Sequence, residues 1–325
     1  MTEQPFKLLH LPAVALRNVL QFLNPLDLFE LSQCSLNSAS IIPLSGSRKF
    51  KLVVNASPLS ISVNDHVFRI GYNRSHPPSW FLERTWKFMD STVRVVYLSR
   101  QQLISYWDDR YVGLKTVFFH LSKIFNCTIE SAKFYSIPAV ISMSIIDFIS
   151  SRQSEIKELF VGGENLTDTN VTEIFDKLRV TDHLSMCHRF SMPPPSISLN
   201  SKSMFIWNSA WITTEHLNSM KNGIVIHLDR STLTDDKMTL FLNNWKSGQF
   251  PNLQYLYIQS RFLSKTFTPF GLPPFQHTHD PQFHMKTILG VERFIYGGVD
   301  VKRDDGVVAN VYFNNQDGVL NMMVL

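Results

Sequence analysis

Residues 11–35 read LPAVALRNVLQFLNPLDLFELSQCS, and this stretch decides how the N-terminal part of the chain folds. In its first half, Leu16, Val19 and Leu20 recur at the three- and four-residue spacing that places side chains on one face of a helix. Pro12 precedes this face. Proline suits a first helical turn because the backbone N–H that it lacks would have no partner there. The pattern predicts a short helix that begins after Pro12.

A second short helix is predicted directly after the first. Asn24 can cap it, Pro25 suits its first position, and Asp27 would lie in its first turn, where the helix dipole favours an anion. Its large apolar residues stand on nearly every side: Leu26, Leu28, Phe29 and Leu31. Three short helices cannot bury so many large apolar side chains among themselves, so the segment needs a partner surface.

The stretch resembles an F-box. Leu11 and Pro12 match the family's Leu-Pro entry, residues 25–31 match its second helix, and residues 32–35 match its Ser-x-Cys-Ser continuation. The commoner F-box has glutamate two positions after the proline, where this chain has Val14. An apolar residue there resembles the divergent F-box of the large nematode families. The other interpretation is an ordinary N-terminal helical hairpin.

Composition indicates an intracellular globular protein. Hydrophobic residues make up 44% of the 325 residues and charged residues 18%, and the net charge is +4. The basic residues are scattered, so nucleic acid is not an expected partner. The cysteines Cys34, Cys127 and Cys187 are odd in number and far apart, which suits a reducing compartment. No signal peptide or membrane-spanning run is recognisable, so we expect the cytoplasm or the nucleus and no membrane partner.

After the helices, residues 51–74 read as short alternating strands, a β-hairpin connector with Asn64-Asp65 as a tight turn. Further on, strand candidates alternate with helical patterns. The strands are expected at 130–135, 156–161, 183–189, 203–207, 223–228 and 253–258, and the helices at 140–150, 168–178, 213–220 and 235–245. Several starts lie roughly 25 residues apart, near the period of leucine-rich repeats. An ordinary α/β sheet remains the alternative.

Residues 233–258 carry a second resemblance. Asp235 and the preceding threonine can cap a helix whose apolar stripe ends at Trp245, and Gly248 can end that helix before a strand. The run Leu-Thr-Asp, Phe-Leu, Trp-x-x-Gly and Pro-x-Leu-x-x-Leu is similar to the type 2 F-box-associated domain of nematode F-box proteins. Residues 166–175 resemble a weaker copy of the same unit.

The predicted fold is therefore α/β or α+β: a three-helix F-box at 5–50, the connector at 51–74, and a leucine-rich-repeat-like domain at 75–325. The C-terminal segments 292–296, 300–302, 307–313 and 319–324 alternate like strands, and Asp-Gly turns join them. They predict a meander of β-hairpins that caps the open end of the repeats.

No catalytic constellation, phosphate loop or zinc-protease motif is present in the sequence. His277, His279 and His284 with Asp280 could ligate zinc. Their proline-rich setting is a poor one for tetrahedral geometry, so we expect no metal and no cofactor. Trp207 and Trp211 could anchor a partner, although core packing is the expectation for Trp207 on a strand.

The two resemblances imply a non-catalytic substrate-recognition subunit of an SCF-type cullin–RING ubiquitin ligase, which docks on a Skp-family adaptor and binds a target protein through its C-terminal domain. The alternative is a leucine-rich-repeat-like scaffold without a ligase. The residues that we expect to bind the adaptor, some of which must pack inside the three-helix unit, are Leu8, Leu11, Pro12, Leu16, Val19, Leu20, Leu26, Leu28 and Leu31.

Overall fold

The structure is a computed structural model of the chain. It describes residues 8–46, 49–73, 83–163, 165–194, 197–272 and 283–325. Contacts divide the chain into two compact units, Met1–Gln153 (unit 1) and Ser154–Leu325 (unit 2). We describe each unit by itself.

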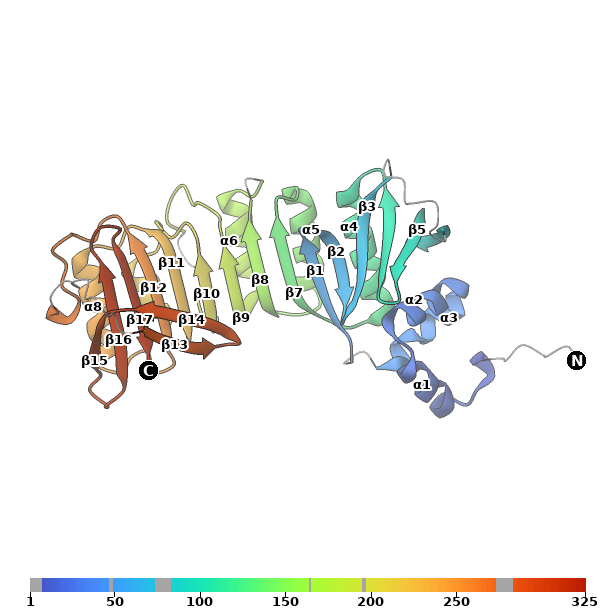
Figure 1. Ribbon diagram of the computed structural model, residues 1–325. Helices are drawn as coiled ribbons and strands as arrows, with labels where there is room; N and C mark the ends of the chain where they lie inside the picture. The colour runs from blue at the N-terminus through green and yellow to red at the C-terminus, as the bar shows by residue number, and fades with distance from the viewer. Residues whose placement is uncertain (1–7, 47–48, 74–82, 164, 195–196, 273–282) are drawn as a thin grey trace, which may run out of the picture. The chain divides into compact units, whose positions relative to one another are not determined.

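Unit 1 begins with a group of short helices (Figure 1). These are the 3-10 helix η1 (Leu8–His10), α1 (Ala13–Phe22), α2 (Pro25–Cys34), α3 (Leu36–Ile41) and the 3-10 helix η2 (Ile42–Ser45). The three predicted α-helices are therefore present, and α1 begins directly after Pro12.

The rest of unit 1 is a mixed sheet with two helices. Its elements are β1 (Lys51–Ala56), β2 (Leu59–Val63), β3 (His66–Tyr72), β4 (Glu83–Phe88), β5 (Ser91–Ser99), β6 (Gln102–Trp107), α4 (Arg110–Phe125), β7 (Thr128–Tyr135) and α5 (Ala139–Ser150). The strand order is β7-β1-β2-β3-β6-β5-β4. Strand β1 pairs parallel to β7, and β3 pairs parallel to β6.

The segment predicted as a connector is thus part of this sheet. Residues 51–72 supply three of its inner strands, because β1 pairs with β7 and β3 with β6 across long stretches of sequence. The predicted boundaries at 50/51 and 74/75 differ from the division by contacts, which falls between Gln153 and Ser154. A local strand pattern carries no information about such distant pairing.

Unit 2 alternates strands and helices before ending in strands. Its elements are β8 (Glu155–Gly162), α6 (Asp168–Lys177), β9 (Arg179–Met186), β10 (Ser203–Ile206), α7 (Thr214–Ser219), β11 (Val225–Ser231), α8 (Asp235–Lys246), β12 (Tyr255–Ser260), η4 (Pro269–Gly271), β13 (Phe283–Ile288), β14 (Val291–Tyr296), β15 (Val299–Lys302), β16 (Val308–Asn314) and β17 (Val319–Val324). The predicted strand–helix alternation is confirmed, and so are the C-terminal hairpins of β15 to β17. The predicted meander is wrong at its start, because β14 pairs with β13 and not with β15.

The sheet of unit 2 has the order β8-β9-β10-β11-β12-β17-β16-β15. Neighbouring strands from β8 to β12 pair in parallel, and β17 adds antiparallel to β12. Helices α6 and α8 lie on one face of the sheet, whereas the hairpin of β13 and β14 lies on the other (Figure 1). We call the face with the hairpin the open face.

Alternation along the strands separates two sets of side chains. One set is fully buried and in register across four strands: Leu184, Met204, Ile226 and Leu256. The set on the open face packs partly under the hairpin, where Ile288 and Ile295 join Val225, Tyr255 and Met323 in one apolar cluster. Burial of both sets holds the sheet between helices and hairpin. Helix α8 buries the predicted apolar stripe, including Trp245.

Candidate functional site

The N-terminal helices are built as the sequence predicts. Asn24 Oδ1 accepts hydrogen bonds from the backbone N–H groups of Leu26 (2.8 Å) and Asp27 (3.0 Å). The amide of Asn24 also donates to the Asp27 carboxylate at 2.6 Å. Ser35 caps α3 in the same way, because its Oγ accepts from the backbone N–H of Ser38. These caps satisfy N–H groups that the first turn of a helix leaves unpaired.

Part of the partner surface that these helices need lies within unit 1. Phe29 of α2 is fully buried. Its ring centroid lies 5.2 Å from those of Phe68 on β3, Trp86 on β4 and Phe88 on β4. His120 of α4 completes the cluster at 6.0 Å. The three-helix segment therefore shares its core with the sheet.

A second group of apolar side chains on the same helices faces solvent. Phe22 is 91% exposed, Leu36 90% and Val14 74%. Val14 and Phe22 lie eight residues apart on α1, on the side away from the buried Leu16 and Leu20. We call Val14, Phe22 and Leu36 the exposed apolar group. These three side chains make the helical segment a candidate interaction surface.

The predicted adaptor-binding residues differ in their exposure, and none of them belongs to the exposed apolar group. Leu16, Leu20, Leu26 and Leu28 are buried in unit 1, and Leu8, Leu11 and Leu31 are partly buried. Pro12 and Val19 are exposed. Their role in binding stays a prediction. The sequence analysis did not include Phe22 or Leu36 in this set. A signal for Phe22 was available, because Phe22 lies outside the apolar stripe of leucines on its helix, and an apolar residue outside that stripe faces away from the core.

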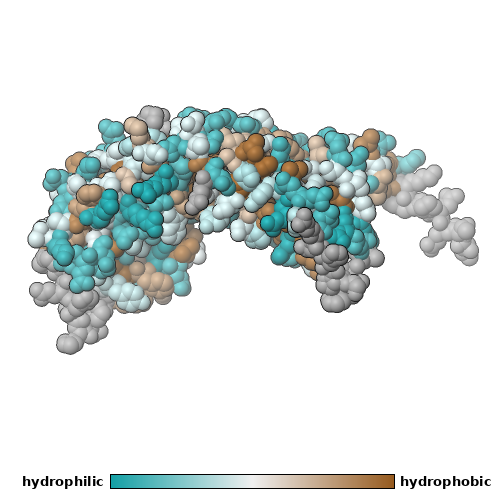
Figure 2. Space-filling view, turned by 90° about the horizontal axis from the view of Figure 1, so that it is seen from above, coloured by the Kyte–Doolittle hydropathy of each residue, from teal (hydrophilic) through white to brown (hydrophobic). Residues whose placement is uncertain are grey.

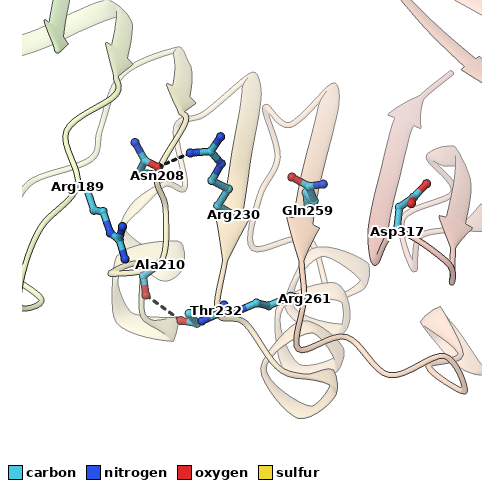
Figure 3. A pocket seen from close by; sticks show the side chains of 8 residues that line it. All are labelled: Arg189, Asn208, Ala210, Arg230, Thr232, Gln259, Arg261 and Asp317. Atoms are coloured by element: carbon cyan, nitrogen blue, oxygen red, sulfur yellow. Dashed lines mark hydrogen bonds between the residues drawn. The ribbon is translucent and has the colours of Figure 1, made fainter. Parts of the chain in front are cut away.

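Unit 2 carries a cleft of about 420 Å³ at the edge where its parallel strands end. The residues that line it are Arg189, Asn208, Ala210, Arg230, Thr232, Gln259, Arg261 and Asp317 (Figure 3). Most of them lie at the ends of four neighbouring strands: Arg189 comes after β9, Asn208 after β10, Arg230 lies near the end of β11 and Arg261 follows β12. Asp317 precedes β17, whose antiparallel pairing with β12 brings it to the same edge. Ligands of open α/β sheets bind at this edge of parallel strands.

Arg230 lies at an irregularity of strand β11. The register between β11 and β12 shifts between Leu228 and Ser231. Arg230 has a φ of 54°, in the left-handed region that a residue with a side chain seldom adopts. Such a bulge re-aims a side chain. Here the Arg230 guanidinium donates to the Asn208 side-chain oxygen at 3.2 Å, across to the loop after β10 (Figure 3).

A row of stacked rings runs along the open face below the cleft. Strand register places Phe205, His227 and Tyr257 side by side on three neighbouring strands. Their ring centroids are 5.0 and 4.2 Å apart, with planes tilted by 19° and 13°. Burial lowers the pKa of His227, against the opposing effect of Asp229, whose carboxylate lies 3.1 Å from Nε2.

Trp207 extends this face toward the cleft. It follows β10, directly before the cleft residue Asn208, and its ring lies 5.8 Å from that of His227. Trp207 is 46% exposed, so the expectation that it packs in the core is wrong. The reason is strand alternation: Met204 and Ile206 face the helices, whereas Phe205 and Trp207 face the open side. Trp211 is buried.

Seen from the edge at which the parallel strands end, unit 2 presents mostly hydrophilic residues, with the hydrophobic ones in small groups (Figure 2). His277, His279 and Asp280 of the histidine cluster lie outside the described residues, and His284 is in β13. The described part of the chain holds no group of three or more His, Cys, Asp or Glu side chains that could bind a metal. None of its helices is long and apolar enough to cross a membrane.

Two segments of the chain match known protein families. Residues 8–50, the helical segment with the exposed apolar group, match the F-box domain family. Residues 194–258, which include β10, β11, the first part of β12 and part of the cleft, match the F-box associated family. Neither a curated protein nor a solved structure matches the chain. The chain thus carries an F-box domain at 8–50 and an F-box-associated domain at 194–258.

Proposed function

We propose that this protein is a substrate-recognition subunit of an SCF-type cullin–RING ubiquitin ligase, whose F-box docks on a Skp-family adaptor and whose unit 2 binds a target protein. The observation that carries the proposal is the presence of an F-box and an F-box-associated domain on one chain. The exposed apolar group on the F-box supports it. F-box domains imply binding to adaptors of this kind.

The exposed apolar group gives the docking step a physical basis. Burying a side chain the size of valine, leucine or phenylalanine contributes about 1.5–3 kcal/mol. Phe22 is the most exposed of the group, and large aromatic side chains are enriched at interface cores. Phe29 and the buried leucines, in contrast, contribute by holding α1 and α2 on the sheet of unit 1.

The mechanism that we propose is tethering, without bond chemistry by this chain. A target held by unit 2 and a ubiquitin-conjugating enzyme held through the adaptor react at a high effective concentration, because their encounter becomes intramolecular. Such a subunit works in the cytoplasm or the nucleus, where we place it.

We further infer that the strand–helix units of unit 2 stack in the manner of leucine-rich repeats and that the associated domain is the type 2 form of nematode F-box proteins. The parallel pairing from β8 to β12, with helices on one face, supports the first inference. The residue patterns at 166–175 and 233–258 support the second.

Co-purification tests the function. The full chain, expressed with a Skp-family adaptor, should retain the adaptor, whereas a Val14→Asp, Phe22→Ser variant should lose it, because the first change brings a charge into the apolar contact and the second removes its largest ring. The control is Val140→Asp, Met192→Ser. Val140 is 73% exposed and Met192 76%, and both lie outside the F-box. Absence of the adaptor from the unmodified chain would favour the scaffold without a ligase.

A further inference from the structure

The lining of the cleft in unit 2 carries more positive than negative side chains. Arg189, Arg230 and Arg261 are all exposed side chains. Arg230 contacts the Asn208 amide, and the Arg261 guanidinium lies 5.1 Å from the Phe262 ring centroid. Within the described residues none of the three forms an ion pair with a carboxylate. Asp317, the acidic residue of the lining, is held by the amide of Asn314 at 2.8 Å.

The three guanidinium groups are spread along the edge of the sheet. Arg230 lies in β11, whereas Arg189 and Arg261 follow the ends of β9 and β12, which are separated by two strands, β10 and β11. At about 4.8 Å between neighbouring strands, the row of strand ends that carries these residues spans about 14 Å. In Figure 3 the Arg230 guanidinium lies beside Asn208, apart from the side chains of Arg189 and Arg261, which extend toward Ala210 and Thr232.

We infer that this cleft binds an extended acidic segment of a polypeptide, with successive carboxylates paired to Arg189, Arg230 and Arg261. The inference deepens the proposed function, because it names the chemical class of segment by which unit 2 would recognise a target. Alternate side chains of an extended peptide lie about 6.6 Å apart on one side, so about four or five residues reach across the row. Arginine pairs with carboxylates through two parallel hydrogen bonds.

The layout favours carboxylates over other anions. A single phosphate group is bound best where several donors converge, and here the Arg230 guanidinium lies apart from the side chains of Arg189 and Arg261. A nucleic acid strand carries a charge at every residue, and Asp317 at one end of the cleft would repel it. In a polypeptide, the residue that faces Asp317 can be neutral or basic.

Aromatic side chains next to the cleft offer an apolar contact to a bound segment. Trp207 directly precedes the cleft residue Asn208 and is about half exposed. Tyr257 lies two residues before the cleft residue Gln259 on β12, on the same face of the sheet. An acidic segment that carries one aromatic or aliphatic side chain can therefore contact the arginines and these rings together.

Fluorescence anisotropy on the purified full chain tests the inference. The probe is a labelled peptide of about eight residues in which glutamate and serine alternate, long enough to span the row at about 3.3 Å per residue. A peptide with glutamine in place of glutamate is compared with it. The glutamate peptide should bind more tightly, and its binding should weaken as salt rises from about 0.1 M to about 1 M, which shortens the Debye length from about 10 Å to about 3 Å.

The variant Arg189→Gln, Arg230→Gln, Arg261→Gln should bind the glutamate peptide at least about fivefold more weakly, as expected for the loss of three exposed ion pairs. The matched control is Lys221→Gln, Lys237→Gln, Lys246→Gln, which removes the same charge from exposed positions outside the cleft lining. It should bind as the unmodified chain does. Thermal unfolding of both variants confirms that they are folded.

Equal binding of the two peptides would overturn the inference, and so would an equal loss of peptide affinity in the arginine and lysine variants. Tighter binding of a peptide with one phosphoserine, or of a short oligothymidine, than of the glutamate peptide would also overturn it. Adaptor co-purification is measured on the same variants. Retained adaptor with no peptide binding overturns the inference alone, whereas peptide binding without adaptor overturns the proposed function alone.

Discussion

The ring of Phe29 in helix α2 meets the ring of Phe68 in strand β3 edge-on, with centroids 5.2 Å apart and planes at 82°. Thirty-nine positions of sequence separate the two residues, and the contact joins the F-box to the sheet of unit 1. Trp86 and Phe88 also stack on Phe29, with planes within 24° of its ring. The F-box helices are therefore one cooperative unit with β3 and β4.

Phe29→Ala should destabilise this unit by about 3–5 kcal/mol, as expected for truncating a fully buried phenylalanine. Because the ring is shared, amide hydrogen exchange should speed up in α2 and also in β3 and β4. Phe22→Ala is the control: Phe22 is 91% exposed, so its truncation should change stability by less than about 0.5 kcal/mol. Faster exchange in the helices alone would mean that they fold independently of the sheet.

His120 of α4 makes unit 1 sensitive to acid. Its Nδ1 accepts a hydrogen bond from the backbone N–H of Met89 at 3.1 Å. Burial, with a smaller effect of the nearby Lys123 charge, lowers the pKa of His120 to about 4. Between about pH 6.5 and pH 4 the unfolded chain therefore binds a proton that the folded chain does not bind.

Stability of unit 1 should accordingly be full above about pH 6.5 and fall as pH is lowered toward 4. At about 1.4 kcal/mol for each pH unit, His120 should contribute a loss of about 3 kcal/mol over this range. His120→Asn keeps an acceptor for Met89 and does not titrate. Urea unfolding at a series of pH values should show a shallower acid loss in the variant, and equal slopes in the two proteins would contradict this assignment.

Trp245 of α8 is the centre of a buried group in unit 2. It is fully buried, its ring lies 6.0 Å from that of Phe270, and the Arg303 guanidinium lies 5.7 Å from its centroid. Its Nε1 has no hydrogen-bond partner among the described residues. Trp245→Ala should cost about 3–5 kcal/mol in a urea titration.

Trp245→Phe should cost clearly less than Trp245→Ala, because it keeps a ring in the site and removes an unpaired buried N–H. If both variants unfold as the unmodified chain does, Trp245 is not packed as described. Adaptor binding by unit 1 should persist in either variant, since Trp245 belongs to unit 2.

The elements that sequence predicted well are those with local signals. Asn24, Pro25 and Asp27 marked the start of α2, and the cap that they form is present. The stripe that ends at Trp245 marked α8, which begins at Asp235. The predicted cap of α8 is wrong, because Thr234 makes no side-chain capping hydrogen bond, and the Asp235 carboxylate accepts from Ser264 instead. Caps and helical stripes depend on residues within a few positions of each other, so a single sequence displays them.

The pairing of strands and the cleft depend on distant residues. Strand β1 pairs with β7 across the intervening β2 to α4, a choice that no local pattern records. Arg189, Arg230 and Arg261 stand far apart in the sequence, and only the parallel register of β9 to β12 brings them to one edge. A usable signal existed, because Arg189 ends one predicted strand, Arg230 and Arg261 closely follow two others, and parallel strands end at the same edge.

Arg230 offers a way to separate strain from binding. Its φ of 54° is costly for a residue with a side chain and free for glycine. Relief of this strain contributes about 1 kcal/mol in Arg230→Gly, and the greater freedom of glycine in the unfolded chain opposes it by about 0.4–1 kcal/mol. The two effects nearly cancel, so Arg230→Gly should melt close to the unmodified chain.

Arg189→Gly is the matched control, because Arg189 is an equally exposed cleft arginine whose φ is not in the left-handed region. It gains no relief and should be destabilised by about 0.4–1 kcal/mol. Both variants should bind the glutamate peptide more weakly, since each loses one guanidinium. Thermal unfolding and fluorescence anisotropy of the two variants test this prediction. If Arg230→Gly is less stable than Arg189→Gly, the hydrogen bond from Arg230 to Asn208 stabilises the fold by more than the backbone strain at Arg230 destabilises it. The bulge would then have a structural role in the strand rather than a role in the cleft.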